Sequence, residues 1–482
     1  MPNKNRKQPY EKMKQSYGKK NTGIVESGKN IPEYPKKSRT QEKKTPVQSP
    51  GKEDEKKKRV CPYEKKCGGC SMIHLPYEKT LAIKERRVRE LLSPYVRLSG
   101  IEGMEHPWHY RNKVHAAFAR IYDGHREKNV CGIYREGTHK IVPVRACKIE
   151  NAKADRIIQD VLELLPSFKI RVYDEDTGYG LLRHVLIRTA RNTGEIMVVL
   201  VLASPVLPGK NNFVKALREK HPEITTVIIN VNDQRTSMIL GQRESVAYGK
   251  GYIEDILCGH RFQISSKSFY QINSVQTEKL YRQAVEWAEL TGVETVVDAY
   301  CGIGTIGITA AEGAGEVIGV ELNRDAVRDA TENAKRNEIT NIRFLNGDAG
   351  AFLEGYVEEG NRCDVLFLDP PRSGSTEQFL RSAAKAGPKR IVYISCDPET
   401  LARDLKLLQS CGYFAQKARA FDMFPFTDSI ETAVLLTKNQ KGRPKKTTSE
   451  KHLSRKSSPE RKGNPYPSKK SGRVKKKSDQ KS

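Results

Sequence analysis

The feature of this sequence that most constrains its fold is an alternation of short apolar runs and helix-like segments that begins near Thr295. The apolar runs are TVVDAY, EVIGVEL, IRFLNGD, CDVLFLDPP, RIVYISC and ETAVLLTK. Between them lie segments with apolar residues at three- and four-residue spacing, such as Arg324 to Asn337 and Glu399 to Ser410. Apolar strands that alternate with amphipathic helices are typical of a doubly wound α/β sheet. We therefore predict a Rossmann-like α/β domain in this part of the chain.

The part of the chain before this domain has a different pattern. From about Trp108 to Cys258 it is rich in β-like segments, among them KVHAAFAR, HVLIRTAR, IMVVLVLA and TVIINVN. These segments predict a separate mixed α/β domain, and a helix near Gln276 to Glu289 would join the two. We place the boundary near residue 265, with a central domain over 60–265 and the Rossmann-like domain over 266–438.

Both ends of the chain are basic and poor in apolar residues. Residues 1–59 hold 18 Lys and Arg against 7 Asp and Glu, and residues 438–482 hold 17 against 3, so the rest carries only +2 of the net charge of +27. Such segments cannot bury enough surface to offset their ordering entropy, and we predict disordered tails over 1–59 and 439–482. Their charge suits salt-sensitive attraction to a polyanion such as a large RNA, or simply keeps the protein in solution.

The composition also limits where the protein works. The longest apolar runs, such as Ile196 to Ala203, fall far short of the roughly 20 residues that a membrane span needs, and the first residues show no signal peptide. Ten cysteines in such a chain indicate metal-binding or catalytic roles rather than disulfides. We therefore predict a cytoplasmic protein with no membrane association, and no protein partner is indicated.

A glycine-rich motif predicts a nucleotide-cofactor site. Asp298 to Gly307 reads as a strand that runs into a glycine turn and then a helix, and the acidic Glu321 ends the next strand. Glycines let the backbone approach a ligand closely, and a carboxylate on the second strand can accept hydrogen bonds from both ribose hydroxyls. This pattern fits both NAD and S-adenosylmethionine.

Three further motifs place reactive side chains beside predicted strand ends. Asp369 follows the strand CDVLFLD and begins the sequence Asp-Pro-Pro-Arg, at the edge where open α/β sheets bind their ligands. Cys396 ends the strand RIVYISC just before a helix, whose N-terminus would stabilise a thiolate. Glu431 enters the last strand, where it could act as a general base. Arg372 is as consistent with a surface cation as with a role in the site.

A cluster of cysteines lies before the central domain's strands. Cys61, Cys67 and Cys70 fall within ten residues, with two glycines between the last two. Three thiolates at this spacing suit an iron–sulfur cluster, and four would equally suit a structural zinc ion. Proximity in the sequence leaves Cys131 and Cys147 both available as a fourth ligand.

Taken together, these motifs resemble the bacterial RNA uracil-5-methyltransferase family over about residues 60–438. The matching motifs are PWHYRNK at 107–113, FYQIN at 269–273, DPPRSG at 369–374, YISC followed by Thr400, and FPFT followed by Glu431. The resemblance implies methyl transfer from S-adenosylmethionine to carbon 5 of a uridine in RNA, through a class I methyltransferase domain. The clustered cysteines resemble members that act on 23S ribosomal RNA and carry a [4Fe–4S] cluster.

The resemblance also implies roles for individual residues. Cys396 would be the covalent nucleophile and Glu431 the proton acceptor. The residues around S-adenosylmethionine would be Gln271, Tyr300, Glu321 and Asp369. The cluster ligands would be Cys61, Cys67, Cys70 and Cys147, which favours Cys147 over Cys131. Asp397 and Ser429 depart from the family, which commonly has Asn after the catalytic cysteine and His two residues before the glutamate.

Many members of that family carry a small β-barrel RNA-binding domain before the cysteine cluster, where this chain has a basic tail. We therefore expect RNA to dock on the tails or on the central domain. Three alternatives stay open: a transfer-RNA substrate, methylation of an exocyclic amine in a nucleic acid, and a non-catalytic RNA-binding factor that uses the cysteine cluster structurally.

Overall fold

The strands expected in the C-terminal half assemble into one eight-stranded sheet. The computed structural model describes residues 60–122 and 124–438. The sheet has the order β1-β16-β17-β15-β14-β11-β12-β13. Its strands are β1 (Leu98–Glu102), β11 (Thr295–Ala299), β12 (Glu316–Glu321), β13 (Ile342–Asn346), β14 (Val365–Leu368), β15 (Arg390–Ser395), β16 (Tyr413–Phe421) and β17 (Glu431–Lys438). The strands β11 to β15 are parallel, and β17 lies antiparallel between β15 and β16.

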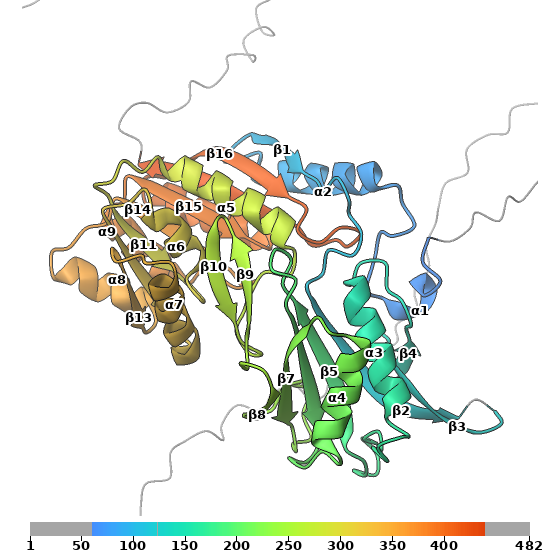
Figure 1. The fold of residues 1–482 in the computed structure, drawn as a ribbon. Helices are drawn as coiled ribbons and strands as arrows, with labels where there is room; N and C mark the ends of the chain where they lie inside the picture. The colour runs from blue at the N-terminus through green and yellow to red at the C-terminus, as the bar shows by residue number, and fades with distance from the viewer. Residues whose placement is uncertain (1–59, 123, 439–482) are drawn as a thin grey trace, which may run out of the picture. The chain divides into compact units, whose positions relative to one another are not determined.

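Helices cover both faces of this sheet (Figure 1). They are α2 (Tyr77–Leu92), α5 (Ser274–Ala288), α6 (Thr305–Ala311), α7 (Arg324–Arg336), α8 (Ala349–Glu358), α9 (Glu377–Ala386) and α10 (Pro398–Ser410). Successive strand residues point to opposite faces, so Val296 packs with α5 and α6 while Val297 packs with α9 and α10. Burial on both faces is why β11, β12, β14 and β15 read as continuous apolar runs, and the arrangement confirms the Rossmann-like α/β fold.

A seven-stranded sheet occupies the middle of the chain, in the order β4-β3-β2-β5-β6-β7-β8. Its strands are β2 (Lys113–Tyr122), β3 (Glu127–Tyr134), β4 (Ile141–Pro143), β5 (Leu182–Thr189), β6 (Ile196–Leu202), β7 (Ile224–Val231) and β8 (Arg243–Tyr248). The helices α3 (Ala152–Leu164) and α4 (Lys210–Lys220) pack on one face of this sheet. A short helix α1 (Glu64–Cys67) precedes it, and a hairpin of β9 (Ile253–Leu257) and β10 (His260–Ile264) follows it.

Two features of this arrangement could not be read from the sequence. The strand β1 pairs in parallel with β16, and α2 packs on the same sheet, although both lie far before the Rossmann-like strands in the chain. The other face of the seven-stranded sheet shares a core with α5 and β11, through residues such as Val199 and Val296. The domain boundary near residue 265 therefore stays a prediction. The tails predicted over 1–59 and 439–482 lie outside the described residues.

Within residues 60–122 and 124–438, none of the helices has the length and apolar character required to traverse a bilayer.

Candidate active site

The sheet order brings the predicted site residues to one edge. From β11 the chain proceeds outward to β12 and β13, and then returns to β14 and β15 on the other side of β11. The carboxyl ends of β11 and β14 therefore flank the point where the strand order reverses, which is where open α/β sheets bind ligands. Tyr300, Asp369 and Cys396 each directly follow one of these parallel strands. Glu431 joins them because β17 runs antiparallel to β15, with Thr432 opposite Ser395.

The glycine turn after β11 holds the carboxylate of Glu321. The backbone N–H of Gly302 donates to Oε2 of Glu321 at 3.1 Å, and the N–H of Asn323 donates to Oε1 at 2.8 Å. Tyr300 and Gly304 have φ angles of +67° and +84°. A side chain at Gly304 would meet the ring of Phe344 at 2.8 Å, so this glycine is required by packing as well as by its backbone conformation. The predicted ribose-binding carboxylate is thus placed beside the turn.

Asp298, which is buried, and Asp369, which is partly buried, are the carboxyl groups that end or follow the neighbouring strands β11 and β14. Asp298 accepts a hydrogen bond from the N–H of Gly307 at 2.8 Å, and its other oxygen has no partner among the described residues. Burial raises the pKa of Asp298 to about 8 and that of Asp369 to about 7. Both groups are therefore largely or partly protonated near neutral pH when no cation is close to them.

Tyr281 connects the side chain of Gln271 with the carboxyl groups of Asp298 and Asp369. The backbone carbonyl of Gln271 accepts a hydrogen bond from Asn112 at 2.9 Å, which fixes the segment before α5. The side chain of Gln271 lies within hydrogen-bonding reach of the Tyr281 hydroxyl, and burial together with the charges of Asp369 and Asp298 raises the pKa of Tyr281. Sequence reasoning had no reason to select Tyr281, because a tyrosine on a buried helix face is usually structural.

Cys396 lies between the end of β15 and the beginning of α10. Asp397 caps this helix, since its side chain accepts hydrogen bonds from the backbone N–H groups of Glu399 at 3.1 Å and Thr400 at 3.0 Å. An asparagine would cap the helix equally well, so this departure from the family pattern preserves the local geometry.

The side chains around Cys396 act against the predicted thiolate. Burial raises the pKa of the Cys396 thiol to about 12, and the nearby carboxyl groups of Glu431 and Asp369 add to this effect. The guanidinium of Arg372 acts in the opposite direction. The balance of burial and nearby charge favours the neutral thiol of Cys396.

Glu431 and Arg372 complete the cluster. The side chain of Glu431 is buried at the first position of β17, and its burial and the charge of Asp369 raise its pKa well above the usual range. Arg372 lowers the pKa of both Glu431 and Cys396, and it donates a hydrogen bond to the hydroxyl of Ser429 at 3.3 Å. From the sequence, Arg372 was as consistent with a surface cation as with a role in the site. In the structure its guanidinium lies next to Cys396 and Glu431, the predicted catalytic pair.

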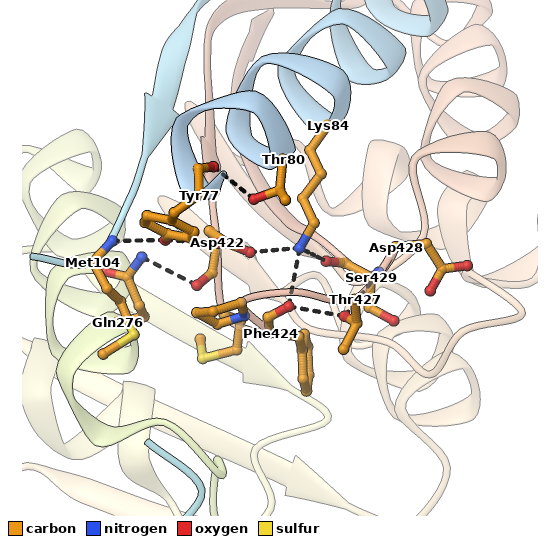
Figure 2. Close-up of polar contacts among 12 residues, drawn as sticks. Tyr77, Thr80, Lys84, Met104, Gln276, Asp422, Phe424, Thr427, Asp428 and Ser429 are labelled. Carbon is orange, nitrogen blue, oxygen red and sulfur yellow. Dashed lines mark hydrogen bonds and ion pairs between the residues drawn. The ribbon is translucent and has the colours of Figure 1, made fainter. Parts of the chain in front are cut away.

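The loop that leads to Glu431 is held by a buried ion pair (Figure 2). The side chain of Lys84, from α2, is 1% exposed and donates to Oδ1 of Asp422 at 2.6 Å. The same ammonium group donates to the backbone carbonyls of Phe424 at 3.0 Å and Ser429 at 2.8 Å. Tyr77 donates to the other carboxylate oxygen of Asp422 at 2.7 Å. One cation therefore connects both ends of the loop to a helix of the N-terminal segment.

Two more hydrogen bonds reach this loop from other segments. The Tyr110 hydroxyl donates to the carbonyl of Pro425 at 3.2 Å, and the N–H of Met72 donates to the carbonyl of Phe426 at 3.0 Å. Sequence reasoning missed this support. The available signal was Lys84 itself, which occupies an otherwise uncharged stripe at four-residue spacing on α2, with Thr80 and Val88 as its neighbours.

The four predicted cluster ligands line one small cavity of about 30 Å³. They are Cys61, Cys67, Cys70 and Cys147. Cys131 lies elsewhere, in the core between the central sheet and α3, where Gln159 donates to its sulfur. The φ of Gly68 is +72°, which lets the loop curl, and the N–H of Gly69 donates to the sulfur of Cys67 at 3.4 Å.

These cysteines gather without forming a site for a single ion. Burial raises the pKa of Cys70 to about 12, and the neighbouring Cys67 and Cys61 add to this effect. Within the part of the chain that the structure describes, no three His, Cys, Asp or Glu side chains are arranged to hold a metal ion.

Comparison with known proteins gives a consistent set of relatives. A profile of the family described as tRNA (uracil-5-)-methyltransferase matches residues 77–439. An uncharacterized RNA methyltransferase of Halalkalibacterium halodurans is 41% identical over 386 residues, which cover 79% of this chain and 83% of that protein. One from Caldanaerobacter subterraneus subsp. tengcongensis is 42% identical over 381 residues, covering 78% and 83%.

A solved structure is similar over most of the chain. It is the Pyrococcus abyssi tRNA (uracil-54, C5)-methyltransferase in complex with S-adenosyl-L-homocysteine. The two chains are 28% identical with a TM-score of 0.65, and the match covers 77% of this chain and 86% of the other.

Proposed function

Because the chain belongs to the tRNA (uracil-5-)-methyltransferase family, we propose that it transfers a methyl group from S-adenosylmethionine to carbon 5 of a uridine, with Cys396 as covalent nucleophile. Membership makes the chain an RNA methyltransferase; the target atom, the covalent step and the particular RNA are the proposed parts. The observation that carries them is the grouping of Cys396, Glu431 and Arg372 at the sheet edge beside the glycine turn. Methylation of an exocyclic amine would need no cysteine there.

The residues around the glycine turn fit S-adenosylmethionine, which when bound supplies a methyl group on a positively charged sulfur. Glu321 presents a fixed carboxylate for the ribose hydroxyls. The unpartnered oxygen of buried Asp298 is a free acceptor in the same cradle, and Asp369 is a carboxyl group that a cation would ionise. We assign Tyr300 to the same cradle because it directly follows β11, and Gln271 because its side chain reaches the Tyr281 hydroxyl.

The proposed chemistry follows from the weak nucleophilicity of carbon 5 of uracil. After its proton passes to solvent, Cys396 adds its sulfur to carbon 6 as a thiolate, and the electron pair of the double bond moves into the ring carbonyl to give an enolate. Carbon 5 is then nucleophilic enough to take the methyl group, and the bond between that methyl group and the donor's sulfur would break to leave uncharged S-adenosylhomocysteine. Glu431 removes the proton from carbon 5, the double bond re-forms, and the bond between sulfur and carbon 6 breaks to return Cys396 as a thiolate. The guanidinium of Arg372 offsets the negative charge that the Cys396 sulfur, the uracil ring and the Glu431 carboxylate carry at successive stages of the reaction.

This scheme requires the charges of the site to change when the methyl donor binds. Burial raises the pKa of both Cys396 and Glu431, which favours their neutral forms. A cation within about 4–6 Å favours the ionised form of an acidic group and lowers its pKa by about 1 to 3. The positively charged donor would therefore prepare both residues for their roles, whereas the uncharged product would leave them neutral.

We expect the pKa of Cys396 to be lower by about 1 to 3 in the complex with S-adenosylmethionine than in the complex with S-adenosylhomocysteine. Because burial raises the pKa of Cys396 to about 12, its thiolate fraction grows as pH rises above the neutral range. Thiolate absorbance in the ultraviolet, measured against pH as the difference from a Cys396→Ser variant, gives the titration. If both ligands shift the titration equally, the charge of the donor does not activate Cys396.

The direct test of the proposed function identifies the methylated nucleoside. Purified protein is incubated with tritiated S-adenosylmethionine and unmodified 23S ribosomal RNA or transfer RNA, and the labelled RNA is digested to nucleosides. Label in 5-methyluridine supports the proposal, and label in a methylated amine overturns it. No label from either RNA, from protein that binds S-adenosylmethionine, would favour the non-catalytic RNA-binding factor.

We propose 23S ribosomal RNA as the substrate, because the cysteine cluster resembles that of members acting on it. Transfer RNA is the alternative, and it is the substrate class named for the similar Pyrococcus abyssi enzyme. The same assay decides between them. A cytoplasmic location stays a prediction.

We further propose that Cys61, Cys67, Cys70 and Cys147 hold a [4Fe–4S] cluster. The donor set fits, since four thiols surround one cavity. Four thiolates would equally suit a structural zinc ion, which is the alternative. The resemblance of these cysteines to those of family members with a [4Fe–4S] cluster favours the cluster.

Protein purified without oxygen is therefore expected to contain iron and sulfide rather than zinc, measured by elemental analysis and visible absorbance. Cys70→Ser should lose most of the iron, whereas Cys131→Ser should retain it. If the protein contains zinc in stoichiometric amount and no iron, the proposed cluster is rejected and the four cysteines form a structural zinc site.

A further inference from the structure

A second cavity, of about 500 Å³, lies beside the loop that carries Glu431. Its wall is formed by the segment between β1 and β2, the first turn of α3, the turn between β5 and β6, and the first turns of α5. The volume falls within the range that accommodates a small ligand or part of a larger one. Neither the cofactor cradle nor the cysteine cavity uses this space.

The wall of this cavity concentrates unneutralised positive charge. Lys153, Arg191 and Lys279 line it, against a single carboxylate from Glu105. Lys279 is paired with Glu102 at 2.7 Å, but Lys153 and Arg191 are exposed and form no ion pair with any described residue. Since residues 60–437 carry a net charge of only +2, two unpaired cations in one cavity indicate an anionic ligand.

Trp108 adds an aromatic surface to the same wall. The side chain is 38% exposed, and its ring is stacked on that of Phe426 with centroids 4.3 Å apart and planes 21° apart. Phe426 belongs to the loop that ends at Glu431, and its φ of +65° is held by the hydrogen bond from Met72. The exposed ring of Trp108 therefore packs directly against the loop that carries Glu431, the proposed base.

We propose that this cavity binds a nucleotide of the substrate RNA adjacent to the target uridine, with its base on Trp108 and its phosphate between Lys153 and Arg191. This inference rests on the proposed function. A uridine must leave its stack to reach Cys396, which leaves neighbouring bases without a stacking partner. An exposed aromatic ring with nearby cations is the combination that binds single-stranded RNA.

Tryptophan fluorescence reports this contact separately from catalysis. The chain has two tryptophans, and Trp287 is buried in the core at 6% exposure, so a base that stacks on the protein surface can only quench Trp108. Titration with oligouridine, and with the RNA that accepts label in the tritium assay, should quench the fluorescence as RNA binds. Filter retention measures the same binding without relying on tryptophan. RNA retention without any change in fluorescence would overturn the proposal.

Substitutions then test the two parts of the site. Trp108→Ala should raise the KM for RNA about tenfold, with kcat and the KM for S-adenosylmethionine unchanged, while Trp108→Phe keeps the affinity and loses the quenching. Lys153→Gln combined with Arg191→Gln should flatten the dependence of log affinity on log salt by about 0.7 for each phosphate that the variant no longer binds. Lys215→Gln, on the exposed face of α4, is the matched control and should change neither quantity.

The outcomes separate this inference from the proposed function. A fall in kcat with unchanged RNA affinity in Trp108→Ala would show that Trp108 only supports the loop. Unchanged RNA affinity and salt dependence in the double variant would assign the cavity to another anion, such as an acidic protein segment. Quenching by RNA in a protein that makes no 5-methyluridine would keep the docking site and reject the proposed reaction.

Discussion

Glu431→Gln is expected to accumulate a covalent complex between the protein and RNA, because the amide cannot accept the proton whose removal allows the Cys396 sulfur to leave. Methyl transfer should still occur once for each bound RNA, while turnover falls about 10²- to 10⁴-fold. Denaturing gel electrophoresis of the protein with labelled RNA and S-adenosylmethionine detects the complex. Tritium in the slowly migrating band would show that the trapped RNA has already been methylated.

Cys396→Ala removes the proposed nucleophile, so this variant should form no covalent complex and no methylated product. Cys411→Ala controls for removal of a thiol, since Cys411 ends the same helix, α10, at the opposite terminus. It should retain normal turnover. Methylation at a normal rate by Cys396→Ala would reject the covalent mechanism, and normal turnover by Glu431→Gln would assign the base to another group.

Lys84→Met is expected to lower the free energy of unfolding by about 3–5 kcal/mol, because it leaves the carboxylate of Asp422 buried without its cation. It also removes the donor for the carbonyls of Phe424 and Ser429, so kcat should fall as the loop before Glu431 loosens. Urea unfolding followed by circular dichroism measures the first effect, and the tritium assay under native conditions measures the second.

The control for this prediction is Lys79→Met, an exposed lysine on the same helix, which should change stability by no more than about 0.5 kcal/mol. Adding Asp422→Asn to Lys84→Met should recover part of the lost stability, because the unpaired charge is gone. A double variant no more stable than Lys84→Met would mean that the orphaned carbonyls, rather than the charge, account for the destabilisation.

The predicted elements of the Rossmann-like half are confirmed, and the pattern is clearest in strands such as β14 and β15, which are buried on both faces. The run RIVYISC forms β15, and the helix expected from Arg324 is α7. The strand β1 gave no such signal. Its partner is β16, more than three hundred residues along the chain, and one short strand at a sheet edge carries too little apolar periodicity to reveal its position.

The candidate site divides in a similar way. Asp369 and Cys396 were selected because each follows a strand, and the parallel sheet places them together. The role of Arg372 was left open, because no sequence signal distinguishes a loop arginine on the surface from one directed at the catalytic pair Cys396 and Glu431. The helix N-terminus that favours a thiolate at Cys396 is visible in the sequence, while the burial and the carboxyl groups that act against it are not.

The sequence by itself determined the α/β fold, the glycine turn, the order of the reactive side chains and three of the four cysteines that gather at one cavity. These follow from local periodicity and from motifs whose residues lie close together in the chain. Only the tertiary structure decided that Lys84 holds the loop before Glu431. It also decided that the Trp108 ring stacks on Phe426 and shares a cavity with the unpaired cations Lys153 and Arg191. Burial and charge at a site are sums over side chains from distant segments, and the chain must fold before those segments meet.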